Sequence, residues 1–191
     1  MDLSITPTKL CGGVLIEGDS STLRMVERLL TRTAIESHAC DDSGICMTLS
    51  RYFEQNGRTV DWVTLFAGVS ALRNSMGFRL SRKDHALICT LEFLVHEALI
   101  KLLPKAESQI DNLLDSMYGF HDLLHGGACE SRMVYLYLLK TPGKRKSELL
   151  KILSSLSPVF RHTYAAYSVQ FEGLHRDMLT YPSGEKFKYP L

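Results

Sequence analysis

The apolar residues of this chain recur mainly every three or four positions, which is the spacing of amphipathic helices. The clearest stripe lies in residues 62–76 and stops before Gly77, a residue that suits the end of a helix. Its members are Trp62, Leu65, Phe66, Val69, Leu72 and Met76. Residues 81–103 form the most apolar stretch, which begins at a Ser81–Asp84 capping arrangement and ends before Pro104. We therefore predict a long helix with one buried face in each range.

Shorter stretches with the same spacing predict the other helices. They are expected over residues 20–32, around Leu49 to Phe53, and over 106–125, 133–139, 147–156 and 157–178. The polar residues 36–44 predict a loop. Segment 133–139 has a composition that also suits a strand, but its flanking residues favour a short helix that ends at Pro142 and Gly143.

The two ends of the chain follow a different pattern. Residues 1–18 alternate β-branched and polar side chains around Gly12 and Gly13, which predicts a hairpin with a glycine turn. The tail 180–191 places a Pro-Ser-Gly turn between two short extended pieces, which could pair with that hairpin. The whole pattern predicts a mainly α, single-domain bundle over 1–191. Its helical body, 20–179, is expected to hold roughly six to eight helices beside a small antiparallel β element.

Composition sets few limits on function. The 191 residues are 45% hydrophobic and 23% charged, which are ordinary values for a globular domain. The net charge of +1 gives no overall attraction to nucleic acid or to an anionic membrane. The five cysteines are an odd, scattered set, and no apolar run reaches the roughly 18 residues that span a bilayer. We expect a cytoplasmic protein with reduced thiols and no membrane contact.

One candidate for chemistry is a metal site between two helices. If the chain folds back at Pro104, residues whose numbers sum to about 208 lie at the same level, so that residue 85 lies near residue 123. The candidate ligands are His85, His121 and His125, with Cys89 and Glu92 as further ones. Nitrogen and sulfur donors in a helical bundle suit zinc or iron, and Glu92 could also serve as a general base.

The histidines also have a simpler interpretation. His121 and His125 stand four residues apart before the double glycine 126–127, where a cationic side chain in the last turn is favoured by the helix dipole alone. The sequence has no His-Glu-x-x-His motif, because the His96–Glu97 pair lacks the second histidine. We favour the ordinary end of a helix and keep the metal site as the alternative.

A second candidate is the basic segment 140–146. Its cations Lys144, Arg145 and Lys146 cluster just before the predicted helix 147–156. Positive charge at the start of a helix is unfavourable unless an anion joins it, so a phosphate or a nucleic acid could bind there. The segment lacks the glycine spacing of a P-loop and a row of aromatic residues for base stacking. A solvated turn is therefore favoured over nucleic-acid binding.

The sequence favours a non-enzymatic interaction or regulatory module that needs no cofactor. Its helices are well patterned, whereas the motifs of nucleophile, cofactor and phosphate sites are missing. We expect a homo-oligomer, and a protein partner is also compatible with the pattern. The alternatives are a hydrolase-like metal enzyme that uses the histidine site, and a nucleic-acid-binding protein that uses the basic segment.

Overall fold

The computed structural model describes residues 2–36, 40–74, 80–116, 132 and 134–156. Within these ranges the chain forms six α-helices, one π-helix and one three-stranded antiparallel sheet. In chain order these are β1 (Leu3–Pro7), β2 (Gly13–Gly18), α1 (Ser20–Glu36), α2 (Cys40–Ser50), β3 (Arg58–Asp61), α3 (Trp62–Asn74), α4 (Arg82–Leu102), α5 (Glu107–Asp115), η3 (Val134–Leu138) and α7 (Pro142–Ser154). The predicted mainly helical fold with a small antiparallel sheet is confirmed.

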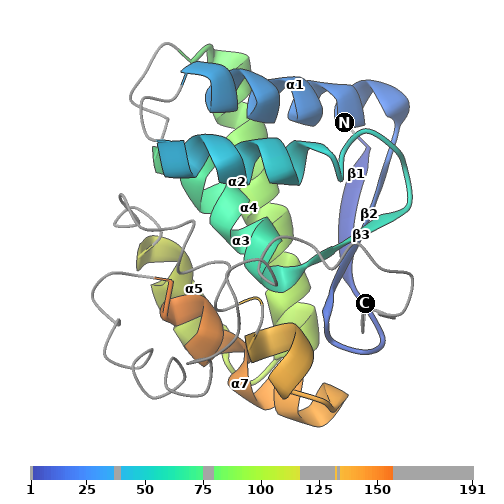
Figure 1. Cartoon of the computed structure of the whole chain (residues 1–191), viewed down its shortest axis with the longest axis vertical. Helices are drawn as coiled ribbons and strands as arrows, with labels where there is room; N and C mark the ends of the chain where they lie inside the picture. Colours follow the sequence, from blue (N-terminus) through green and yellow to red (C-terminus); the bar gives the residue numbers. More distant parts are fainter. Residues whose placement is uncertain (1, 37–39, 75–79, 117–131, 133, 157–191) are drawn as a thin grey trace.

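The sheet has the strand order β1-β2-β3, with both pairs antiparallel. The predicted hairpin supplies β1 and β2, in a register that places Ile5 opposite Ile16. Strand β3 was not predicted from the sequence, because four residues are too few to show a strand pattern. Figure 1 shows the sheet standing beside α1 and α2, which lie next to each other, while α5 and α7 lie at the opposite end of α4.

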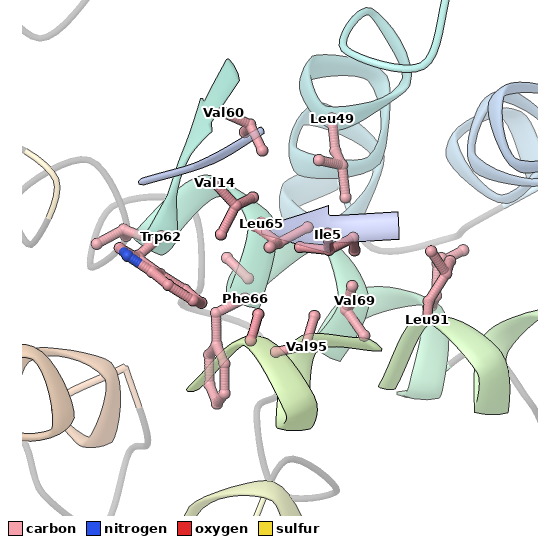
Figure 2. Packing of buried hydrophobic residues seen from close by; sticks show 14 of the residues in the cluster. Ile5, Val14, Leu49, Val60, Trp62, Leu65, Phe66, Val69, Leu91 and Val95 are labelled. Atoms are coloured by element: carbon pink, nitrogen blue, oxygen red, sulfur yellow. The ribbon is translucent and has the colours of Figure 1, made fainter. Parts of the chain in front are cut away.

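Helix α3 is the centre of the hydrophobic core. Every residue from Trp62 to Leu72 is buried, so the helix is covered all round and not along the single stripe that its sequence predicts. Figure 2 shows its side chains Leu65, Phe66 and Val69 among Ile5 and Val14 from the sheet and Leu91 and Val95 from α4. Small residues make this burial possible. A Cβ at Gly68 would come within 2.3 Å of Cδ2 of Leu49 on α2.

Helices α4 and α5 fold back on each other at Pro104, as predicted. Helix α4 begins with the expected capping box, in which the Ser81 hydroxyl accepts from the Asp84 backbone N–H and the Asp84 carboxylate accepts from the Ser81 backbone N–H. His96 Nε2 of α4 lies 3.0 Å from Asp111 Oδ1 of α5, a pair that agrees with the predicted antiparallel register. Helix α5 ends at Asp115, with Ser116 as its C-cap, and the rest of the predicted helix, residues 117–125, lies outside the described residues. In the described part of the chain, no helix is both long and apolar enough to cross a membrane.

Two helix starts differ from the prediction. Helix α2 begins at Cys40, inside the range 36–44 that was predicted to be a loop. Helix α7 begins at Pro142, which was predicted to end the preceding helix. Pro142 occupies the first turn of α7, where its missing N–H costs nothing, and the Thr141 hydroxyl accepts from the Lys144 backbone N–H at 3.3 Å.

Residues 134–138 of the segment 133–139 are helical, as predicted, although η3 has π-helical and not α-helical hydrogen bonding. The predicted final helix, 157–178, and the tail 180–191 lie outside the described residues. A pairing between the tail and the N-terminal hairpin therefore stays a prediction.

We predict that Gly13→Ala destabilises the protein. An added Cβ would lie 2.0 Å from the carbonyl oxygen of Val60 on β3, and backbone cannot move aside as a flexible side chain can. The free energy of unfolding should fall by about 2 to 3 kcal/mol, as for other overpacked sites, measured by urea denaturation. Gly143→Ala is the matched control, since nothing lies within 4 Å of its Cβ position. The control should leave stability unchanged or raise it by up to about 1 kcal/mol, and equal losses in both variants would contradict the packing argument.

Candidate functional site

Two polar side chains of α4, Glu92 and His96, contact two different neighbouring helices. The Glu92 carboxylate accepts a hydrogen bond from Nη1 of Arg73 on α3 at 2.8 Å, and both side chains are less than one-fifth exposed, at 19% and 18%. His96 turns the other way, toward Asp111 on α5. These two contacts hold α4 against α3 on one side and against α5 on the other.

The structure does not bring the predicted metal ligands of α4 to one point. Glu92 is paired with Arg73, Cys89 is exposed on the outside of the helix, and His85 is half-buried. Within the described ranges, no group of three or more His, Cys, Asp or Glu residues could hold a metal ion. His121 and His125 lie outside those ranges, so a zinc or iron site that uses them stays a prediction, which elemental analysis of the purified protein would test.

The pKa of the Glu92 carboxyl group differs from that of an exposed glutamate. Burial raises the pKa of Glu92 above its ordinary value, although the nearby Arg73 guanidinium favours the charged form. Perturbed carboxyl groups occur in catalytic sites and also in ion pairs that hold helices together. The contact between α3 and α4 accounts for the position of this side chain without a reaction.

A buried polar cluster joins the tip of the β1–β2 hairpin to the last described helices. We call it the hairpin anchor. It consists of the carbonyl groups of Leu10 and Cys11 and the side chains of Asp61, Arg132, Tyr135 and Arg145. The Tyr135 hydroxyl donates to the Cys11 carbonyl, and Nη1 of Arg145 donates to the Leu10 carbonyl at 3.0 Å.

Asp61 forms the other half of the hairpin anchor. Its side chain is fully buried and caps α3, because it accepts from the Thr64 backbone N–H at 2.9 Å and from the Thr64 hydroxyl at 2.8 Å. Arg132 Nε donates to the same carboxylate at 2.6 Å. A buried carboxylate needs such partners, and here both its charge and its hydrogen-bonding capacity are used within the protein.

The shape of the hairpin turn explains why its carbonyl groups are available. Sequence analysis placed the turn on Gly12 and Gly13, but the positive φ belongs to Cys11, at 55°. The Thr8 backbone N–H donates to the Gly13 carbonyl, and the Cys11 N–H donates to the Thr8 carbonyl. The carbonyl groups of Leu10 and Cys11 are thus left for side chains of η3 and α7. Gly13 has another role, because its missing side chain lets the backbone of β2 approach β3 closely.

The hairpin anchor offers little chemistry. Burial raises the pKa of Tyr135, and the neighbouring Cys11 and Asp61 act in the same direction against Arg145, so this phenol is uncharged. The Tyr135 hydroxyl donates a hydrogen bond to a backbone carbonyl, and the Cys11 thiol is buried. The cluster is therefore built to hold segments together.

The structure buries Arg145, one of the three cations of the predicted anion site, and anion binding there stays a prediction. The Arg145 side chain is only 4% exposed and belongs to the hairpin anchor, whereas Lys144 and Lys146 are exposed. It lies on the buried face of α7 with Leu149 and Ile152, at helical spacing. That spacing is the signal that sequence analysis could have used, but the basic composition of the segment suggested solvent. Two of the three predicted cations remain at the surface.

The outside of α4 carries a surface that sequence analysis did not single out. We call it the outer face of α4, and its members are Arg82, Lys83, Ala86, Cys89, Phe93 and Glu97. All six are exposed, and they recur at helical spacing over almost the whole helix. Phe93 lies in the middle of this outer face, and its side chain is 60% exposed. The spacing of apolar residues gives Phe93 no role, because only the packing of α3 and α5 against the other sides of α4 decides that this side faces solvent.

We predict that Asp61→Asn unfolds far more easily than the natural protein. The amide can still accept a hydrogen bond, but it leaves the charge of Arg132 without its buried partner. The loss should be about 3 kcal/mol or more, the usual effect of breaking a buried ion pair, measured by chemical denaturation. Asp111→Asn is the control, because its side chain is 55% exposed. There the change should stay within about 0.5 kcal/mol, and a similarly small change at Asp61 would show that the anchor contributes little.

Comparison with known proteins assigns no family to this chain. No protein-family model, no curated protein and no solved structure matches it. Any function proposed for it must therefore be argued from its own residues.

Proposed function

We propose that this chain is a non-enzymatic interaction or regulatory module that works as a homodimer, with the outer face of α4 as its contact surface. The observation that carries the proposal is Phe93, a large aromatic side chain 60% exposed at the middle of the longest described helix. Aromatic side chains at the centre of a surface patch are typical of residues that dominate binding energy.

The neighbourhood of Phe93 also suits a contact surface. Cys89 lies one turn before it and Ala86 two turns before it on the same face, and both are small and exposed. A second helix can approach closely over small residues, and charged side chains at the two ends supply a polar rim. This arrangement has the apolar centre and polar border of a protein–protein interface.

The polar side chains elsewhere support a structural use of the fold. Glu92, His96, Asp61 and Tyr135 each contact a different element or a distant turn of the chain. Each of these contacts accounts for its side chain without a substrate. The small net charge of +1 also means that two copies repel each other little.

Replacing Phe93 by Gln should separate the homodimer. Glutamine keeps the helix propensity of the position and removes the aromatic surface. We expect the dissociation constant of the dimer to rise by about tenfold or more, measured by sedimentation equilibrium over a range of concentrations. Met47→Gln on α2 is the matched control, a partly exposed apolar residue on another helix, and it should leave the dissociation constant unchanged.

Circular dichroism and the denaturation midpoint should be the same for both variants and the natural protein, because neither side chain belongs to the core. A natural protein that stays monomeric at every concentration would overturn the proposed function. So would a dimer that Phe93→Gln leaves intact.

A further inference from the structure

The outer face of α4 has a pattern that matches itself when the helix is reversed. Arg82 and Lys83 stand at one end and Glu97 at the other, with Ala86 and Phe93 between them. The midpoint of this pattern along the sequence lies between Cys89 and Thr90. Arg82 and Glu97 are the same number of residues from it on either side, and so are Ala86 and Phe93. A reversed copy of the helix therefore places acid opposite base and the large side chain opposite the small one.

We infer that two copies of this chain pair through α4 in antiparallel orientation, about a two-fold axis that passes beside Cys89. This inference rests on the proposed function and adds the geometry of the contact. In it, Phe93 of each copy packs over the partner's Ala86, and Arg82 of each copy meets the partner's Glu97. The contact is isologous, the commonest arrangement in homodimers.

Charge decides between the two ways of pairing identical helices. In a parallel pair, Arg82 and Lys83 of both copies would lie together at one end, and the two Glu97 carboxylates would lie together at the other. Like charges placed opposite each other are unfavourable, whereas the antiparallel pair replaces both repulsions by attractions. The two helix dipoles also oppose each other favourably in the antiparallel pair.

The side chains at the proposed axis fit a close approach. The Thr90 hydroxyl already donates to the Ala86 carbonyl at 2.8 Å, so its burial leaves no unsatisfied donor. The Glu97 side chain is 57% exposed, with Oε1 at 3.6 Å from Nδ1 of His96, so its carboxylate can reach a second chain. With about 1.5 Å of rise per residue, the two Cys89 residues are offset by only about 1.5 Å along the helices.

A charge exchange tests this geometry. Arg82→Glu alone and Glu97→Arg alone each place like charges together twice in the dimer, and each should raise the dissociation constant by about three- to tenfold. The double variant Arg82→Glu/Glu97→Arg restores opposite charges and should return to within about twofold of the natural protein. Lys146→Glu, on the exposed side of α7, is the control for a change in net charge and should have no such effect.

Thiol cross-linking gives an independent measurement. The experiment uses the variant Cys40→Ser/Cys129→Ser. Of its three remaining cysteines, Cys89 is exposed, whereas Cys11 and Cys46 are buried. A short bismaleimide should join two chains through Cys89, and Cys89→Ser should abolish the product. A cysteine moved to position 101 should not cross-link, because the antiparallel pair separates its two copies by roughly 35 Å along the helix.

The outcomes separate the inference from the proposed function. A dimer that Phe93→Gln weakens, but that the double charge variant does not restore and that cross-links equally well through position 101, overturns the antiparallel geometry and leaves the proposed function standing. A monomeric natural protein overturns both. Rescue by the double variant, together with cross-linking through Cys89 alone, supports the antiparallel pair.

Discussion

The packing of the C-terminal described helices depends on the hairpin anchor, which connects them to the first turn of the chain. The Cys11 carbonyl lies in a buried contact, where it would cost about 1 to 3 kcal/mol without a donor, and the Leu10 carbonyl lies in a partly buried one. Tyr135 and Arg145 supply those donors. Asp61 adds a buried charge that is stable only with Arg132 beside it. The anchor therefore ties η3 and α7 to the hairpin turn, because separating them would leave the Cys11 carbonyl and the Asp61 carboxylate without these donors.

The hydrophobic core also stabilises the protein, but its contacts are non-directional and do not fix the orientation of a helix. Helix α3 is covered on all sides by the sheet, by α2 and by α4, so its burial removes apolar surface from water but does not by itself select one orientation. Orientation comes from close packing at small residues such as Gly68 and from the cap that Asp61 provides. Asp61 thus belongs both to the start of the central helix and to the anchor, and it joins the two parts of the structure.

Helix α4 is held by neighbouring elements on several sides and exposed on its outer face. Its inner face packs into the core, and its two flanks are held by the Arg73–Glu92 pair and by the contact between His96 and Asp111. The remaining side carries Phe93, whose aromatic side chain is 60% exposed. Glu92 and His96, polar residues that could have suggested catalysis, position the helix, whereas Phe93 lies at the surface.

The sequence by itself determined the elements whose signals are local. The spacing of apolar residues placed α3 and α4, the Ser81–Asp84 box placed the start of α4, and Pro104 placed the fold-back to α5. It predicted the hairpin but not β3, which is too short to show a period. Only the tertiary structure decided that Arg145 is buried, that Glu92 faces Arg73 and that Phe93 faces solvent. The reason is that a side chain's spacing assigns it to one face of a helix, whereas the partner on that face comes from segments far away in the chain.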